Sequence, residues 1–309
     1  MISEATRARS ARAQKRRTGS AAVGEFLVFT LPLLVFLLIL YGTLFWNFYV
    51  SMANWVSTAP DYTFTGLKWY NYLLSQSRFW INVQNNLKWL TLGVVPTIVV
   101  AILLAYLLEL APFPGVESYV RTLILYPVAM SFVVTGTIWS WLYQPDRGVF
   151  NTLLRSLGID STLRYTSDPT SATYWLILIF IWQYLGFSVI IIQSSLRTSE
   201  LQEMVEAATV DGASKLRILV SVIVPNIRSG ILVLVSLLLI STLKVFDIVW
   251  IVTRGGPGVA TDVLATNMIV TAYDQRLASA GAAIGVIIFL MAFIIIIPYT
   301  IYALKKWFE

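Results

Sequence analysis

The chain has 309 residues, of which 57% are hydrophobic and 12% charged, and its formal net charge is +6. A soluble domain carries roughly 25% charged residues, so this composition indicates a protein embedded in lipid. The chain contains no cysteine and no histidine. This excludes disulfides, metal sites built on those residues, thiol nucleophiles and imidazole acid–base chemistry.

A basic tail, residues 1–25, precedes the first apolar segment. It holds six of the basic side chains, which are Arg7, Arg9, Arg12, Lys15, Arg16 and Arg17. The positive-inside rule explains this cluster without a nucleic-acid ligand and predicts a cytoplasmic N-terminus. The apolar run that follows is too long for a cleaved signal peptide, and no small-residue cleavage pattern follows it. We therefore interpret it as a retained first span.

Six segments are apolar enough over about 20 residues to cross a bilayer. They are residues 26–50, 87–108, 122–143, 174–193, 231–252 and 281–302. A weaker piece, Val259 to Tyr273, is interrupted by Asp262 and Asn267 and is predicted to be a surface or re-entrant helix. The predicted fold is an all-α integral membrane protein with one transmembrane domain over residues 26–305. Its six spans return the C-terminus to the cytoplasm.

The fourth span mixes aromatic and hydrogen-bonding side chains. Gln183, Tyr184 and Ser188 accompany Trp182 there, and such a surface suits a sugar ring. Anchoring at the membrane interface explains Trp182 and Tyr184 equally well. Gln183, Tyr184 and Ser188 are candidates for a substrate path.

A half-polar stretch, residues 199–225, separates the fourth and fifth spans. Ser199 is predicted to cap a helix, with Gln202 completing a capping box. An apolar stripe follows at helical spacing, made of Leu201, Met204, Val205 and Ala208. Gly212 stands where this helix would stop, because glycine adopts the left-handed conformation freely. A second short helix ends at Pro225. The sequence predicts a cytoplasmic helix–turn–helix, either a connector in the headgroup region or a docking element.

The fifth span carries the two charges that lie deep in a predicted span. Lys244 and Asp247 are three residues apart, and Ser241 and Thr242 precede them. Charge inside a bilayer is costly and indicates function by default. Two interpretations stay open. The ions pair with each other on one helical face and fix the helix in the bundle, or these four residues line a translocation path.

The loop between the fourth and fifth spans resembles the coupling loop of permease subunits of binding-protein-dependent ABC importers. The shared pattern is E-A-A, three residues, G, nine residues, an aliphatic, one residue, an aliphatic and P. The matching positions are Glu206, Ala207, Ala208, Gly212, Val222, Val224 and Pro225. The resemblance implies that this loop docks in a groove of a cytoplasmic ATPase. It assigns the coupling role to Glu206, Ala207, Ala208, Asp211, Gly212 and Pro225.

Segments outside the loop resemble the carbohydrate-uptake, maltose-transporter-like group of these permeases. They are Pro145–Asn151, Trp182-Gln183, Gly186-Phe187, Phe246-Asp247, Thr253, Gly255-Gly256-Pro257 and Thr261. The resemblance, which covers roughly residues 25–305, implies a multi-pass protein of a prokaryotic inner or plasma membrane. It would move a sugar or sugar-like solute from an extracytoplasmic binding protein into the cytoplasm. The implied partners are a second permease, ATP-binding subunits, the binding protein and membrane lipid.

No G-x-x-x-x-G-K-[ST] phosphate-binding loop occurs in the chain, so ATP hydrolysis is expected in a separate subunit. No catalytic residue, metal site or cofactor is expected in this chain, since ATP and magnesium belong to the partner ATPase. The alternative is a self-sufficient secondary transporter for a polar solute. Proton coupling would need deep carboxylates or histidines, and only Asp247 is available.

Overall fold

The computed structural model describes the backbone of residues 2–110, 114–159 and 163–307. It describes the side chains of the same ranges except those of residues 2–25, 114, 116, 302–304, 306 and 307, so the side chains of the predicted basic tail lie outside it. The described part is helical, apart from connecting loops and an isolated antiparallel bridge between Ala53 and Phe64. The all-α prediction is therefore confirmed.

The elements follow one another without a repeated unit. The first half contains α1 (Ile2–Ser51), α2 (Lys68–Ser75), α3 (Ser77–Lys88), the π-helical turn η1 (Trp89–Gly93), α4 (Val94–Glu109), α5 (Pro114–Leu125), the 3-10 turn η2 (Tyr126–Ala129), α6 (Phe132–Leu142) and α7 (Val149–Ser156). The second half contains α8 (Ala172–Leu196), α9 (Ser199–Val210), α10 (Lys215–Ile218), η3 (Leu219–Ile223), α11 (Val224–Asn226), α12 (Arg228–Leu243), α13 (Asp247–Val252), α14 (Leu264–Ile269), η4 (Val270–Asp274) and α15 (Ala278–Trp307).

Several of these helices are long and apolar enough to cross a bilayer. Four single segments qualify by length and composition, and they are Phe26–Ser51, Ser77–Glu109, Ala172–Leu196 and Ala278–Ile301. Two bent pairs qualify when each is counted as one span, and they are Glu117–Ala129 with Phe132–Leu142 and Lys215–Asn226 with Arg228–Leu243. The described residues therefore contain four to six apolar spans.

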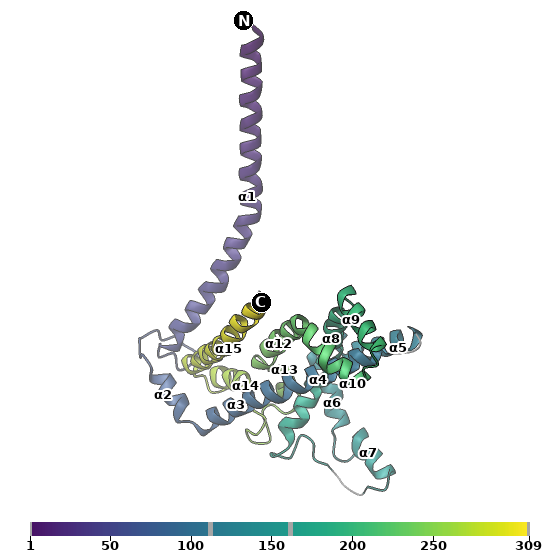
Figure 1. Cartoon of the computed structure of the whole chain (residues 1–309). Coiled ribbons are helices and arrows are strands. Elements are labelled where there is room, and N and C mark those ends of the chain that lie inside the picture. The colour runs from purple at the N-terminus through teal and green to yellow at the C-terminus, as the bar shows by residue number, and fades with distance from the viewer. Residues whose placement is uncertain (1, 111–113, 160–162, 308–309) are drawn as a thin grey trace.

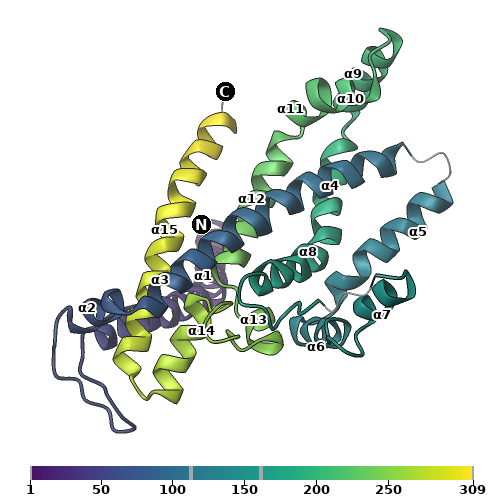
Figure 2. The same ribbon diagram turned by 90° about the horizontal axis from the view of Figure 1, so that it is seen from below.

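Helix α8 lies at the centre of the bundle and contacts α4, α5, α6, α12 and α13. Its fully buried side chains include Leu176, Ile179, Phe180 and Ile192. In Figure 2, α9, α10 and the C-terminal end of α15 lie toward one side of the molecule, and α6, α7 and α14 toward the other. The predicted coupling loop thus lies at one end of the bundle, on the side opposite α7 and α14.

The predicted third span, residues 122–143, is not one helix. Its two halves are bent by 104°. Pro127 lacks an N–H and so interrupts the helical ladder, and α6 restarts with Ser131 as its N-cap. Gln183 of α8 satisfies the carbonyls freed by this break, because its Nε2 donates to the carbonyl oxygens of Pro127 at 2.6 Å and Met130 at 3.0 Å.

The predicted fifth span, residues 231–252, is also interrupted. α12 ends before Lys244 and α13 begins at Asp247, so the prediction that these two charges share one helical face is wrong. The break buries Val245, which is 6% exposed, while Lys244 and Asp247 both stay exposed. In a continuous helix, Lys244, Val245 and Asp247 would project from one axis at fixed angular steps. The break frees the two charges to turn outward while Val245 turns inward.

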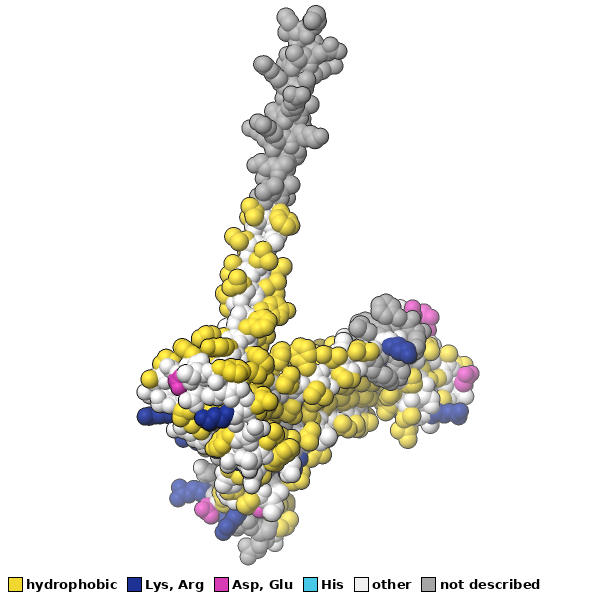
Figure 3. All heavy atoms as spheres, turned by 90° about the vertical axis from the view of Figure 1, so that its left-hand side faces the viewer, with side chains coloured by type: hydrophobic (Ala, Val, Ile, Leu, Met, Phe, Trp, Pro, Cys, Tyr) yellow, Lys and Arg dark blue, Asp and Glu magenta, His cyan; other side chains and the backbone are white. Residues whose placement is uncertain are grey.

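Helix α1 leaves the rest of the bundle along most of its length (Figure 1). Its C-terminal end packs on α15, where Nδ2 of Asn47 donates to the carbonyl of Ala282 at 3.3 Å. Between Phe26 and Tyr49 no side chain is buried. Hydrophobic side chains cover this stretch in Figure 3. A helix that is apolar all round belongs in lipid or against another protein surface.

Candidate functional site

The segment after α8 carries the positions that the resemblance assigns to coupling. Helix α9 begins at Ser199 with Thr198 as its N-cap, and Thr198 makes no side-chain capping hydrogen bond. The predicted capping box with Ser199 as N-cap is therefore wrong by one residue, because Thr198 is the last residue with extended backbone. Leu201 is buried, and Val205 and Ala208 pack against the core. One face of α9 thus lies on the bundle.

The turn after α9 is built around Gly212, whose φ of 74° is the left-handed conformation predicted for it. The N–H of Ala213 donates to the carbonyl of Ala208 at 3.0 Å, which closes α9. Ser214 then caps α10, since its Oγ accepts from the N–H of Arg217 at 3.4 Å. No atom lies within 4 Å of a Cβ placed on Gly212. Only the backbone conformation requires glycine there.

Three apolar side chains of this loop are exposed. Val210 is 88% exposed, Leu216 is 70% exposed and Val220 is 59% exposed. Of the positions assigned to coupling, Ala208 is half-buried, and the exposed ones are Glu206, Ala207, Asp211, Gly212 and Pro225. We call the exposed residues of this loop, together with the half-buried Ala208, the loop face.

The second predicted site lies where α12 gives way to α13. Among the described residues, neither Lys244 nor Asp247 forms an ion pair. The first interpretation of these charges, an ion pair that fixes the helix, is therefore wrong. Tyr184 and Ser241 join them around a small cavity of about 40 Å³, whose other walls include Phe132, Phe180 and Phe246. Four of the seven predicted path residues meet here.

The other three predicted path residues, Gln183, Ser188 and Thr242, are buried. Oε1 of Gln183 accepts from Oγ1 of Thr135 at 2.5 Å, and its Nε2 donates to the carbonyls of Pro127 and Met130 at the break in the third span. Oγ of Ser188 donates to the carbonyl of Tyr184 at 2.8 Å. Oγ1 of Thr242 donates within α12 at 2.9 Å. These polar atoms are used inside the bundle, and none of the three residues lines the small cavity.

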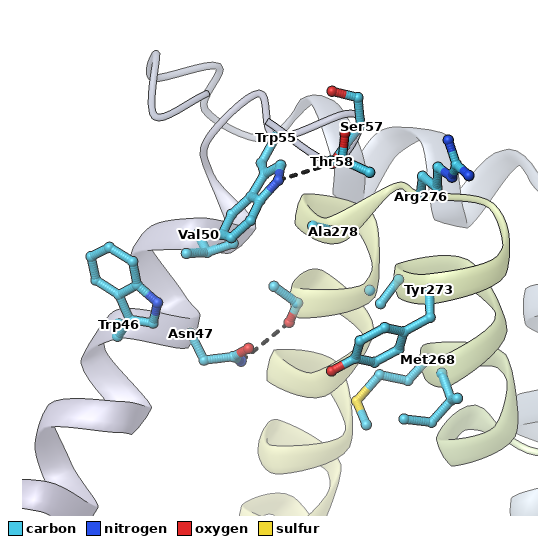
Figure 4. Close-up of a pocket in the computed structure, with 14 residues that line it drawn as sticks. Trp46, Asn47, Val50, Trp55, Ser57, Thr58, Met268, Tyr273, Arg276 and Ala278 are labelled. Carbon is cyan, nitrogen blue, oxygen red and sulfur yellow. Dashed lines mark hydrogen bonds between the residues drawn. The ribbon is translucent and has the colours of Figure 1, made fainter. Parts of the chain in front are cut away.

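A larger cavity of about 540 Å³ lies between the end of α1 and the start of α15, and we call it the α1–α15 cavity (Figure 4). Its lining includes Trp46, Asn47, Trp55, Ser57, Tyr273 and Arg276. Met268 and Ile269 line both this cavity and a neighbouring one of about 380 Å³, which also touches Lys244 and Phe246. Lys244 and Phe246 line the small cavity as well. The three cavities, taken in order from the α1–α15 cavity to the α12–α13 break, therefore share lining residues with their neighbours.

Sequence reasoning missed a polar cluster on α3. Asn82, Asn85 and Asn86 are buried there. Nδ2 of Asn85 donates to the carbonyl of Asp262 at 2.8 Å, and Nε of Arg78 donates to a carboxylate oxygen of Asp262 at 2.7 Å. Asp262 is only 1% exposed, so the weak seventh piece is packed into the bundle and not on a surface. The spacing of the three asparagines at i, i+3 and i+4 was a readable signal.

This arrangement, a helical loop at one end and a charged break in a core helix, can be compared with known proteins. The family described as "Binding-protein-dependent transport system inner membrane component" matches residues 89–308. The chain belongs to this family. The permease is 35% identical over 281 residues to a probable ABC transporter permease protein of Pyrococcus horikoshii, and the match covers 90% of this chain and 95% of that one.

Two further relatives carry names that specify a solute. A xylose/arabinose import permease protein of Haloferax volcanii is 30% identical, with 89% of this chain and 86% of that one covered. A trehalose/maltose transport system permease protein of Thermococcus litoralis is 28% identical, with coverages of 94% and 95%. The permease therefore matches these relatives over nearly its whole length.

Solved structures share the fold. A chain of a bacterial ABC transporter involved in the import of the acidic polysaccharide alginate superposes with a TM-score of 0.79 at 21% identity, covering 94% of the permease and 99% of that chain. A second structure of a bacterial alginate ABC transporter, in complex with an alginate pentasaccharide-bound periplasmic protein, gives a TM-score of 0.77 at 21% identity, with coverages of 89% and 92%.

Proposed function

We propose that this permease imports a sugar or sugar-like solute that an extracytoplasmic binding protein delivers. A second permease would complete the pore, and separate cytoplasmic subunits would bind and hydrolyse ATP with magnesium. Support comes from relatives named for xylose/arabinose and trehalose/maltose import. The arrangement requires six spans, with each bent pair as one span and both termini in the cytoplasm.

The observation that carries the solute path is the exposure of Lys244 and Asp247 at the α12–α13 break. α12 has 16 residues, which places Lys244 about 24 Å along the helix from its first turn. Charges at such a depth do not face hydrocarbon, because their desolvation is too costly. They face water or another protein, so the path would run past Tyr184, Ser241, Lys244 and Asp247 between this permease and its partner.

The loop face would dock the ATPase. Exposed apolar side chains such as Val210, Leu216 and Val220 indicate a surface that another protein or lipid covers. The competing explanation for their exposure is a connector that lies among the lipid headgroups. Glu206, Ala207, Asp211 and Gly212 are exposed on the same loop, where Ala208 is half-buried, and Pro225 is exposed in α11. Small side chains next to exposed apolar ones allow close approach by a groove.

Substitution of Gly212 and Glu206 tests the docking role. Gly212→Val forces a β-branched residue to a φ of 74°, which such residues avoid. Gly212→Asn is the matched control, because asparagine tolerates this conformation. Glu206→Lys changes the surface charge and leaves the helix intact. We expect Gly212→Val and Glu206→Lys to insert normally but to retain less ATPase on affinity purification, and Gly212→Asn to retain it. Full retention in all three would show that the loop is only a connector.

Proteoliposomes separate the importer from the secondary-transporter alternative. The permease, its partner, the ATPase and the binding protein are reconstituted, and uptake of labelled xylose, maltose and trehalose is measured. Uptake is expected only with ATP at the ATPase side and with binding protein at the other. Uptake by the permease alone under a proton gradient would contradict the proposal.

A further inference from the structure

Arg197 occupies the junction between α8 and the loop. It is the C-cap of α8 and directly precedes Thr198, the N-cap of α9. Its Nε donates to Oε1 of Glu109 at 2.7 Å, and its Nη2 donates to Oε1 of Glu117. One guanidinium thus joins the last residue of α4, the first turns of α5 and the start of the loop. We call these three residues the ionic clamp.

Electrostatics explain why an arginine stands beside Glu109 in the ionic clamp. Glu109 ends α4, where the negative end of the helix dipole disfavours a carboxylate. A cation from another element offsets this, and Arg197 supplies it with a planar fork that can serve two carboxylates. The hydrogen bond with Glu109, with a smaller contribution from Glu117, raises the pKa of Arg197 above its ordinary value. The guanidinium therefore stays charged at every physiological pH.

A second contact ties α4 to the other helix of the loop. The hydroxyl of Tyr106 donates to the carbonyl of Lys215, the first residue of α10, at 3.0 Å. Tyr106 and Glu109 lie three residues apart on one face of α4. Between them and α9 is a cavity of about 350 Å³ that Leu201 and Glu206 also line. The loop is thus held to α4 at both ends of α9 while α9 itself keeps room to shift.

Helix α4 leads from these contacts toward the solute path. Its 16 residues form a rod of about 24 Å. At the far end, Gly93 of η1 faces Thr242 of α12, whose methyl carbon lies 3.2 Å from a Cβ placed on the glycine. Thr242 is two residues before Lys244, at the break. A displacement of the clamp can therefore be transmitted along α4, and through the contact of Gly93 with Thr242, to the charged site.

We propose that Arg197 is a positioning residue for coupling, which makes the loop move as one body with the cytoplasmic ends of α4 and α5. This inference rests on the proposed docking of the ATPase at the loop face. The clamp does not bind the ATPase or the solute. Its role is to convert a displacement of α9 into a displacement of α4.

The test uses the reconstituted complex and compares three single variants. Arg197→Gln removes both contacts of the clamp, and Glu109→Gln removes one. Arg155→Gln is the matched control, because Arg155 is exposed on α7, where it donates to the carbonyl of Asp146, and shares no contact with the clamp. The readouts are the ATPase retained on purification, ATP hydrolysis stimulated by the binding protein, and labelled solute from the sugar panel transported per ATP hydrolysed.

We expect Arg197→Gln and Glu109→Gln to retain the ATPase but to transport roughly two- to fivefold less solute per ATP, the factor by which a partly exposed ion pair shifts an equilibrium. The double variant should be no worse than Arg197→Gln, because both changes break one unit. Arg197→Lys should recover part of the ratio, since it restores charge without the fork. Arg155→Gln should match the unchanged permease.

Three results would overturn the inference. In the first, Arg197→Gln transports as much solute per ATP as the unchanged permease while Gly212→Val loses coupling. The role proposed for the clamp is then wrong, and the proposed docking at the loop stands. Lower membrane levels of Arg197→Gln with an unchanged ratio show a purely structural role. An equal fall in Arg155→Gln shows a general charge effect. If Gly212→Val and Glu206→Lys keep the ATPase bound and coupled, docking itself fails and the clamp falls with it.

Discussion

Gly186 marks a close approach between α8 and α5. A Cβ placed on this glycine would lie 2.1 Å from the carbonyl oxygen of Ile124 and 2.8 Å from its carbon. These are backbone atoms and cannot rotate away. Packing thus explains the glycine of the Gly186-Phe187 pair, one of the features that resemble the carbohydrate group. It lets the central helix touch the backbone of the broken third span.

Gly186→Ala should therefore destabilise the permease by about 1–3 kcal/mol or more, because overpacking against backbone has no cheap relief. Thermal unfolding of the purified protein in detergent measures this. Gly42→Ala is the matched control in α1, where no atom lies within 4 Å of the added carbon and alanine favours helix. Equal melting temperatures for the two variants would show that α5 and α8 are farther apart than described.

Lys244 and Asp247 can be tested one at a time because they do not pair. Had they paired, removing one would have left an uncompensated buried charge and damaged folding. We now expect Lys244→Met and Asp247→Leu to reach normal membrane levels and to lower uptake. The double variant should give no recovery of folding over either single one. Arg155→Met, at an exposed position of α7, is the control. Low levels of both single variants, restored in the double, would contradict this expectation.

At the scale of elements, apolar length predicted where the long helices run but not where they break. α8 and the apolar part of α15 follow from composition alone. The break at Pro127 depends on Gln183, which is distant in sequence, to satisfy its carbonyls. The break at Lys244 could not be predicted, because the apolar content of a segment gives no information on its backbone dihedral angles. Gly212 was predictable because its constraint is local. The spacing of the asparagines of α3 could be read from the sequence, but their partners could not, because these lie 175 to 178 residues away.

The packing of α3 against the loop before α14 gives a prediction at this scale. Asn85 donates to the carbonyls of Ala260 and Asp262, both at 2.8 Å. Asn85→Ala leaves the buried carbonyl of Asp262 unsatisfied, at a cost of about 1–3 kcal/mol, while the carbonyl of Ala260 still accepts from the hydroxyl of Thr173 at 3.1 Å. The variant should melt at a lower temperature, whereas Asn71→Ala, at an exposed position of α2, should not. An unchanged melting temperature in Asn85→Ala would mean that water replaces the amide.

The whole molecule has two distinct ends, and orientation in the membrane follows from which end carries the loop. α9, α10 and the end of α15 share one side in Figure 2, as expected if the loop and the C-terminus both face the cytoplasm. A reporter active only in the cytoplasm should work when fused at Arg16, at Ser199 or after Glu309. The same reporter at Ser167, between α7 and α8, should be silent. Activity at Ser167 would reverse the orientation.

The detached course of α1 bears on how the cell handles this chain. From Phe26 to Tyr49 the helix buries no side chain against its own bundle, so its apolar surface is left for lipid or another protein to cover. If the proposed partner permease covers it, a copy made without that partner leaves this helix to lipid alone. We therefore expect production of this chain together with its partner to give more of it in the membrane than production of this chain alone.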